Sequence, residues 1–312
     1  MQVHVEGTRA LRFDDGSPVR AASALAPLGR GWLVAQDDAT HVAWLVDGAV
    51  RRLRVFPPVE GHDVFSEADG TKHLKPDLEA ACRVDHSGRP GVLLLGGGAT
   101  AARRRGVLVT GEDEPAVTVG SLDALYDAVA RTLDIPDGQL NLEGVARNGA
   151  VLRWFQRGNL AAGVPSASVD VDLPALLDAL IGRRDPATVP LRAPRRYAFP
   201  EVSGVGLAAT DAVALPDGRV LLSAAAEDTA NAIDDGAVVG AALALVDGEE
   251  VLDVAPLPEV DGVVQKVEGL GIEDLLPDGL RLRAVVDADD PLAPSVELTM
   301  RVSWSAPGSV RL

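Results

Sequence analysis

The stretch that decides the fold reads Leu140-Asn141-Leu142-Glu143-Gly144-Val145-Ala146-Arg147-Asn148-Gly149-Ala150-Val151-Leu152-Arg153-Trp154-Phe155-Gln156-Arg157-Gly158-Asn159. Two runs rich in β-forming residues flank Asn148-Gly149. Asn-Gly between such runs is a strong hairpin signal, because both residues tolerate positive φ. The sequence therefore predicts a hairpin whose first strand opens on the carboxylate of Glu143 and whose second strand ends in polar residues.

Related units recur along the chain. In each unit a turn that contains glycine precedes a short apolar run, and the run ends in Gly, Gln or acidic residues. Set in register, these runs are residues 32–38, 92–98, 151–157, 220–228 and 282–290. A shorter strand precedes each turn; it begins at Glu79, Glu143, Asp211 or Glu268 in four units and near Ser23 in the first.

Repeated antiparallel units of four strands are typical of a β-propeller, because a single unit cannot bury both faces and its neighbours must stack into a closed ring. The sequence predicts an all-β propeller of five four-stranded blades, or six if residues 166–199 contain another blade. Residues 2–13 are expected to complete the last blade and so close the ring. An orthogonal β-barrel would leave the repeat unexplained.

Two helical segments interrupt the repeat. Residues 121–133 have helical spacing with Ser121 as a candidate N-cap, and residues 174–182 end at a glycine. Both are expected as short insertions between blades. No linker divides the chain, so we expect a single propeller domain over residues 1–312.

Composition limits the compartment and the partners. The 312 residues are 47% hydrophobic and carry a formal net charge of −17, which disfavours nucleic acid and anionic membranes as partners because both need a basic surface. Cys82 is the only cysteine, so no intramolecular disulfide is possible. Residues 1–6 alternate like a strand and do not resemble a secretory signal, and no stretch approaches a membrane span. We expect a cytoplasmic protein.

The acidic residues of the repeat are expected to converge. The first strand of every propeller blade lines the central channel, so residues at the same position of each blade gather on one face. Gathered carboxylates repel one another and favour a cation among them, and oxygen ligands suit Ca²⁺ or Mg²⁺. The candidate metal ligands are Glu79, Glu143, Asp211, Glu268 and Asp287.

Four basic residues offer an alternative to a metal. Lys75, Arg104, Arg157 and Lys266 could neutralise the same acids as an ion-pair network, and the sequence leaves the two explanations open. With Gln156, these four are also the candidate substrate-binding residues. Glu143 and Glu268 are the candidate catalytic acids or bases.

A nucleotide cofactor is not expected. Gly96-Gly97-Gly98, followed by Arg103-Arg104-Arg105, lacks the helix that phosphate-binding glycine loops require. The five histidines are scattered without metal-ligand spacing, and no Ser/His/Asp set is indicated.

Three short motifs lie mainly in the second half of the chain: Asn141-Leu142-Glu143-Gly144-Val145-Ala146, Lys266-Val267-Glu268-Gly269-Leu270 and Val285-Val286-Asp287-Ala288-Asp289-Asp290-Pro291. They resemble the phytase-like esterase β-propeller family, in which a Lys-x-Glu-Gly-Leu/Ile/Val-Ala strand is followed by a strand that ends in Asp-x-Asp-Asp. The last unit matches best and the third matches in part, whereas Asp211 and Ser23 depart from the pattern. The resemblance implies a propeller with a carboxylate-rich channel mouth and bound Ca²⁺.

Two functions are therefore compatible with the sequence. The first is a metal-dependent hydrolase of phosphate or carboxylic esters, with a cation that polarises the substrate and Glu143 as base. The second is a non-catalytic propeller that binds a small ligand or a protein, with a structural role for the acids. A small molecule is expected in the channel mouth, and the sequence does not identify a protein partner.

Overall fold

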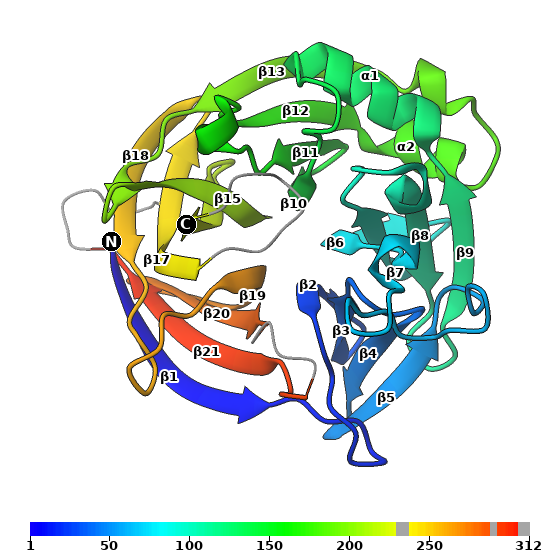
Figure 1. The fold of residues 1–312 in the computed structure, drawn as a ribbon, viewed down its shortest axis with the longest axis horizontal. Coiled ribbons are helices and arrows are strands. Elements are labelled where there is room, and N and C mark those ends of the chain that lie inside the picture. The colour runs from blue at the N-terminus through cyan, green and yellow to red at the C-terminus, as the bar shows by residue number, and fades with distance from the viewer. Residues whose placement is uncertain (229–236, 288–291, 305–312) are drawn as a thin grey trace.

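The computed structural model describes residues 1–228, 237–287 and 292–304. It shows five antiparallel sheets arranged as blades around a central channel (Figure 1). The prediction of an all-β propeller with five blades is confirmed, and the six-blade alternative is wrong. Residues 166–199, where a sixth blade could have been hidden, instead supply the outer half of the third blade.

The blades follow one another along the chain. Blade 1 contains β2 (Ala22–Leu28), β3 (Gly31–Gln36), β4 (His41–Val46) and β5 (Ala49–Arg54). Blade 2 contains β6 (Leu78–His86), β7 (Arg89–Gly96), β8 (Arg105–Thr110) and β9 (Ala116–Ser121). Blade 3 contains β10 (Leu142–Asn148), β11 (Val151–Gln156), β12 (Ser166–Asp172) and β13 (Leu191–Tyr197). Blade 4 contains β15 (Val205–Ala214), β16 (Val220–Asp228), β17 (Ala237–Asp247) and β18 (Glu250–Pro256), with the short β14 (Glu201–Val202) at its inner edge.

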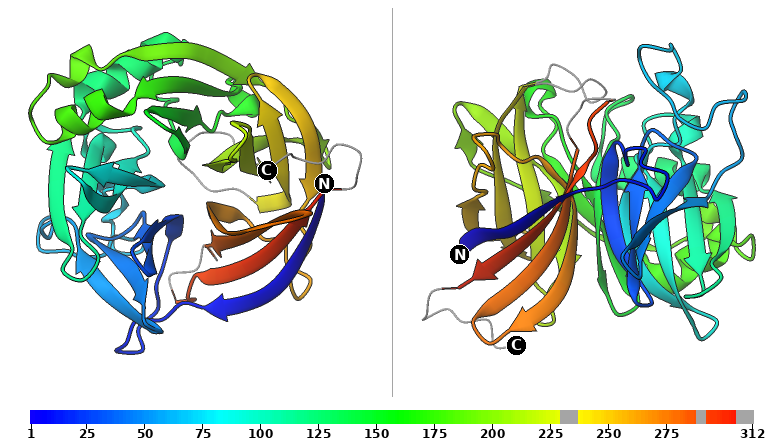
Figure 2. Two further views of the ribbon diagram at one scale, coloured as in Figure 1. Left: turned by 180° about the vertical axis from the view of Figure 1, so that it is seen from behind. Right: turned by 90° about the horizontal axis from the view of Figure 1, so that it is seen from below.

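The N-terminal strand closes the ring. Blade 5 consists of β19 (Val267–Leu276), β20 (Gly279–Val286), β21 (Val296–Ser303) and, outermost, β1 (Gln2–Ala10). β1 pairs antiparallel with β21, from Gln2 opposite Ser303 to Ala10 opposite Val296, and the two strands run side by side in both views of Figure 2. The predicted closure by the N-terminal strand is confirmed.

Two helices lie at the outer rim of blades 2 and 3 (Figure 1). α1 (Asp123–Leu133) connects these blades, as expected. α2 (Leu173–Leu180) instead connects two strands of the same blade, because in the chain it follows β12 and precedes β13. Both pack into the apolar core of blades 2 and 3, where Tyr126 of α1 meets the fully buried Trp154 edge-on at 4.9 Å between ring centroids. Among the described residues, no helix is long and apolar enough to cross a membrane.

The hairpin of blade 3 has the predicted strands with its turn one residue later than expected. Asn148 stays in β10 opposite Val151, so the turn residues are Gly149 and Ala150. Gly149 has φ of +60°, whereas Asn148 does not take positive φ. Glycine at the first central position is the requirement of a type II′ turn.

Each inner strand carries a β-bulge, near its beginning in four blades and midway along β15 in blade 4. The residue at the register shift is Ser23 in β2, Glu79 in β6, Glu143 in β10, Thr210 in β15 and Glu268 in β19. A bulge re-aims the side chain of its extra residue. These five residues, called the bulge ring below, occupy equivalent places around the end of the channel where the inner strands begin, which we call the upper mouth.

The glycine that follows the glutamate in two blades is required by close packing between blades. A Cβ atom on Gly144 would lie 2.8 Å from Cα of Asp211 in blade 4, and one on Gly269 would lie 2.9 Å from Cα of Ala24 in blade 1. The Glu-Gly pairs of the sequence therefore have two functions. The glutamate places a carboxylate at the mouth, and the glycine leaves room for the backbone of the next blade.

Candidate functional site

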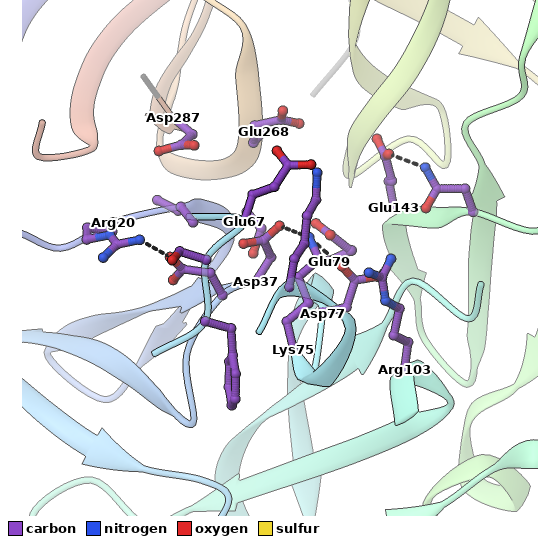
Figure 3. A pocket seen from close by; sticks show the side chains of 18 of the residues that line it. Arg20, Asp37, Glu67, Lys75, Asp77, Glu79, Arg103, Glu143, Glu268 and Asp287 are labelled. Atoms are coloured by element: carbon purple, nitrogen blue, oxygen red, sulfur yellow. Dashed lines mark hydrogen bonds and ion pairs between the residues drawn. The ribbon is translucent and has the colours of Figure 1, made fainter. Parts of the chain in front are cut away.

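The upper mouth contains a polar cavity of about 410 Å³ (Figure 3). Its walls come from the beginnings of β2, β6, β10 and β19, from the ends of β3 and β11, and from the loop that joins blades 1 and 2. Eight carboxylates and six cationic side chains line it: Asp37, Asp38, Glu67, Asp77, Glu79, Glu143, Glu268 and Asp287, with Arg20, Lys72, Lys75, Arg103, Arg157 and Lys266. The predicted acidic site is thus present, and cations are interleaved with its acids.

The structure brings together most of the residues that the sequence proposed. Those that line the cavity are Lys75, Glu79, Glu143, Arg157, Lys266, Glu268 and Asp287. Residues 288–291, which hold the rest of the Asp-x-Asp-Asp motif, lie outside the described residues. Arg104, Gln156 and Asp211 do not line the cavity.

Each of these three residues has a local structural role. Arg104 donates to the carbonyl of Gly98 at 3.0 Å and pairs with Asp127 of α1 at 2.6 Å. Gln156 is fully buried; its Oε1 accepts from the Asn141 amide at 2.8 Å and its Nε2 donates to the Gln139 carbonyl at 2.8 Å. This placement gives no support to substrate binding by Arg104 or Gln156.

The prediction that Asp211 belongs to the ring of acids is wrong by one residue in register. The bulge residue of β15 is Thr210, so Asp211 aligns with Gly144 and Gly269 instead of with the glutamates. Asp211 is buried, and its Oδ2 accepts from the Leu270 amide of the next blade at 2.6 Å. The Thr210 hydroxyl donates to the carbonyl of Val267 at 2.6 Å, as Ser23 does to that of Leu78. The bulge ring therefore contains three glutamates and two hydroxyl residues. The two hydroxyl groups donate hydrogen bonds to the neighbouring blade.

One side of the mouth is a chain of alternating charges across blades 3, 4 and 5. Arg157 lies 3.0 Å from Glu143 and also contacts Glu227 of β16. Lys266 lies 3.5 Å from Glu227 and 2.8 Å from Glu268. Asn141 completes the chain by donating to Glu143 at 2.7 Å.

The other side joins blades 1 and 2. Lys75 contacts Asp37 and lies 2.7 Å from Asp77, and Arg103 lies 3.2 Å from the second oxygen of Asp77. Arg20 pairs with Asp38 at 2.8 Å. Among the described residues, the Glu79 carboxylate has neither a hydrogen bond nor an ion pair.

Three of these acids could hold a metal ion. Asp37, Asp77 and Glu79 each offer an oxygen, and the three oxygens lie within 4.8 Å of one another. The donor set fits a hard divalent cation, which binds carboxylate oxygens. The Lys75 ammonium group already bridges Asp37 and Asp77, so a divalent cation at this place would compete with a cation of the protein itself.

Burial shifts the protonation of several of these acids. It raises the pKa of Glu143 to about 7, although Arg157 opposes the shift, and the Glu268 charge adds to it. Burial, together with the Asp37 charge, raises the pKa of Asp38 to about 7. Burial and the charges of Asp77 and Asp37 raise the pKa of Glu79 well above its usual value. Burial alone would lower the pKa of Lys75, but the acids around it raise that pKa well above its usual value.

Two acids that line the cavity each have one buried carboxylate oxygen without a hydrogen-bond partner. These are Oε2 of Glu143 and Oδ1 of Asp38, whose side chains line the cavity while the residues are only 6% and 8% exposed. Buried acceptors without partners are uncommon in proteins, and a ligand, water or proton usually satisfies them. The arrangement suits general acid–base chemistry near neutral pH or the binding of hydroxyl groups.

Sequence reasoning missed several charged or polar lining residues, among them Arg20, Glu67, Lys72, Asp77, Arg103 and Asn141. Asp77 and Asn141 precede their bulge glutamates by two residues, as Lys266 precedes Glu268. That shared spacing was a usable signal. Arg20, Glu67 and Arg103 lie in connecting segments outside the repeat, and no periodic pattern marked them.

Several solved structures align with most of this chain at low sequence identity. A hypothetical protein from Leishmania major aligns over 97% of this chain and 92% of its own, with a TM-score of 0.48 at 14% identity. A GH43 β-1,3-galactosidase aligns over 95% of this chain and 59% of its own, with a TM-score of 0.50 at 8% identity. Glutaminyl cyclase from Myxococcus xanthus aligns over 97% and 98%, with a TM-score of 0.43 at 11% identity. At these identities the likeness concerns the fold alone.

Comparison by sequence gives a family without a known activity. No curated protein matches the chain. One family model matches residues 71–291, which include the bulge glutamates and all of the inner strands except β2. The chain belongs to the family of unknown function DUF6910.

Proposed function

We propose that the upper mouth is the active site of a hydrolase of phosphate or carboxylic esters that uses a bound Ca²⁺ or Mg²⁺ ion. The observation that carries the proposal is the convergence of Asp37, Asp77 and Glu79 on the wall of a 410 Å³ cavity. Three carboxylates with additional waters suit either ion. The resemblance of the Glu-Gly motifs to phytase-like esterase propellers supports the same activity.

The surrounding residues have roles that follow from their charge and burial. A divalent cation would supply the polarisation of the carbonyl or phosphoryl oxygen. Glu143, with a pKa of about 7, would accept the proton of the attacking water, because a base is most effective when its pKa lies near the working pH. Glu268 is the second acid–base candidate, and Arg157 and Lys266 would orient an anionic part of the substrate.

Binding of the metal ion is the first step to test. The protein is treated with a chelator and then titrated with Ca²⁺ and with Mg²⁺ in a calorimeter. We expect saturable heat with at least one ion, and binding weaker by about tenfold or more in Glu79→Gln, since even the loss of an outer-sphere partner has such an effect. This variant breaks no hydrogen bond or ion pair of the described residues. Glu249→Gln, an exposed acid in the β17–β18 turn, is the matched control.

Hydrolysis is the second step. A panel of carboxylic and phosphate esters is assayed with the metal-loaded protein and with Glu143→Gln. We expect Glu143→Gln to lower turnover without abolishing metal binding, because Glu143 is not one of the three converging acids. Absence of any binding heat with both ions would overturn the metal-dependent mechanism.

A second function is favoured by the position of Lys75. Because Lys75 already neutralises Asp37 and Asp77, the upper mouth can exist as a stable ion-pair network that binds a small polyhydroxylated ligand without catalysis. In this alternative the acids that line the cavity, such as Glu79, would accept hydrogen bonds from the ligand. This function would be supported if titration with Ca²⁺ and Mg²⁺ gave no binding heat while a polyol bound saturably.

A further inference from the structure

The other end of the channel contains a second cavity, of about 400 Å³. It is lined by residues 25–27 of β2, 81–83 of β6, 212–214 of β15 and 270–272 of β19, and by Val145 and Arg147 of β10. On β2, β6, β10 and β19 these residues follow those that line the upper mouth. At about 3.3 Å per residue, this places the cavity further along the channel axis, and we call it the lower mouth.

A layer of five buried residues, which we call the waist, lies between the two mouths. The residues that follow the bulge ring are Ala24, Ala80, Gly144, Asp211 and Gly269; all are buried, and none lines either cavity. The close approach of Gly144 to Asp211 and of Gly269 to Ala24 leaves no space for larger side chains. A ligand in the lower mouth would therefore be bound independently of the upper mouth.

The chemistry of the lower mouth is opposite to that of the upper mouth. Most of its lining is apolar and includes Leu25, Val145, Val213, Leu270 and Ile272. The described residues that line it include two arginines, Arg83 and Arg147, and no carboxylate. In a chain with a net charge of −17, this is a concave apolar surface with local positive charge.

The two arginines of the lower mouth differ in their contacts with the rest of the protein. Arg147 donates to the Arg83 carbonyl at 2.9 Å and lies 3.4 Å from the exposed carboxylate of Asp85. The Arg83 side chain is exposed and makes no hydrogen bond or ion pair with the described residues. Its guanidinium group is therefore available to an anion at the edge of the apolar cavity.

We propose that the lower mouth binds a medium-chain carboxylate. The alkyl chain would lie against Leu25, Val145 and Leu270, and the carboxylate would pair with Arg83 in the two-pronged geometry that guanidinium and carboxylate groups share. Ligand sites are typically concave, of 300–1,000 Å³, largely apolar and marked by a few polar groups. The lower mouth meets these conditions. The inference does not depend on the proposed hydrolase.

Calorimetry with decanoate, below its micelle-forming concentration, tests the proposal. We expect saturable binding of one decanoate per chain. Octanoate should bind about fifteenfold more weakly, because it lacks two methylenes and each buried methylene contributes about fourfold. Decylammonium, with the same chain and the opposite charge, should bind less tightly than decanoate by about fivefold or more, the upper range for an exposed ion pair.

Variants locate the site. Arg83→Gln should weaken decanoate binding by about fivefold and should strengthen decylammonium binding, because it removes a like charge beside the ammonium group. Arg83→Lys should retain most of the affinity for decanoate. Arg183→Gln is the matched control, since Arg183 is an exposed arginine beyond α2, away from the lower mouth. Ala214→Leu, which reduces the cavity, should weaken decanoate and decylammonium alike. Absence of saturable decanoate binding, equal affinity for decylammonium, or an unchanged affinity in Arg83→Gln would overturn the proposal.

Discussion

At the scale of single residues, the upper mouth shows how burial sets the chemistry of an acid. Glu79, Glu143 and Asp38 lie among cations, yet the pKa of each is raised. Loss of hydration is the largest cause in all three cases, and it outweighs the nearby Arg157 or Arg20 charge. Glu143 and Asp38, with pKa values of about 7, can donate and accept protons near neutral pH, which carboxylates in water do not.

Stability should fall as the pH rises from about 4 to about 7. The pKa values of Glu143 and Asp38 are about 7 in the folded protein, whereas unfolded carboxyls titrate near 4. The folded state then binds more protons in this range, so its stabilisation is complete below pH 4 and is lost as the pH rises through 7. Urea unfolding at several pH values should show a decrease on the order of 1–3 kcal/mol per group.

The variant Glu143→Gln isolates one of these groups. It removes the titration, so its free energy of unfolding should depend less on pH than that of the unmodified protein between pH 5 and pH 8. A pH dependence equal to that of the unmodified protein would contradict the raised pKa. Asp15 and Asp63, which pair with exposed arginines, have lowered pKa values. They therefore change the free energy of unfolding only below pH 4, outside this window.

Asp211 supplies a second prediction at this scale. Burial raises the pKa of Asp211 well above the usual value, and its Oδ2 accepts a hydrogen bond from the Leu270 amide of the next blade. Asp211→Asn keeps an acceptor and should change stability by less than about 1 kcal/mol. Asp211→Ala leaves the amide unsatisfied and should cost about 1–3 kcal/mol in urea unfolding. Equal losses in the two variants would show that the hydrogen bond is unimportant.

At the scale of elements, the bulged inner strand is the unit that makes the site. The sequence predicted these strands and placed Glu79, Glu143 and Glu268 at their beginnings, because hydrophobic runs, glycine turns and acids recur together. It failed at Asp211, since a single bulge changes which neighbour faces the channel and periodicity does not reveal where a bulge lies. It also missed Arg20, Glu67 and Arg103, which tertiary contacts alone bring to the mouth.

Replacement of the packed glycines tests the contact between inner strands. Gly144→Ala and Gly269→Ala would each place a Cβ atom within 2.9 Å of the neighbouring backbone, and backbone cannot move aside as a flexible side chain can. Each variant should lose about 1–3 kcal/mol of stability, the usual effect of overpacking. Gly7→Ala is the matched control because a Cβ atom at Gly7 in β1 would contact nothing within 4 Å.

Thermal unfolding of the three glycine variants provides the measurement. Gly144→Ala and Gly269→Ala should also lower the affinity of any ligand that binds in the upper mouth, because displacement of the strand moves the adjacent glutamate. If Gly7→Ala is as destabilised as the other two, the effect belongs to the loss of glycine in a strand and not to the contact between blades.

At the scale of the whole molecule, closure of the ring holds the site together. The glutamates of the bulge ring come from blades 2, 3 and 5, and blade 5 is completed by β1 at the opposite end of the chain from β21. Sequence reasoning could predict this closure because residues 2–13 alternate like a strand and precede the first full unit. It could not predict the waist that divides the channel, which depends on how closely the inner strands approach.

Deletion of residues 1–10 should therefore affect the molecule as a whole. It would expose the edge of β21, whose unpaired backbone groups favour association with other chains, and it would uncover the apolar cluster against which Val3 and Val5 pack. We expect a lower melting temperature and concentration-dependent aggregation, measured by calorimetry and light scattering. His4→Ala, which changes an exposed side chain of β1 and keeps the strand pairing, is the control and should behave as the unmodified protein. A deleted protein that remained monomeric with an unchanged melting temperature would show that blade 5 is stable with three strands, and that the pairing of β1 with β21 is not what maintains the ring.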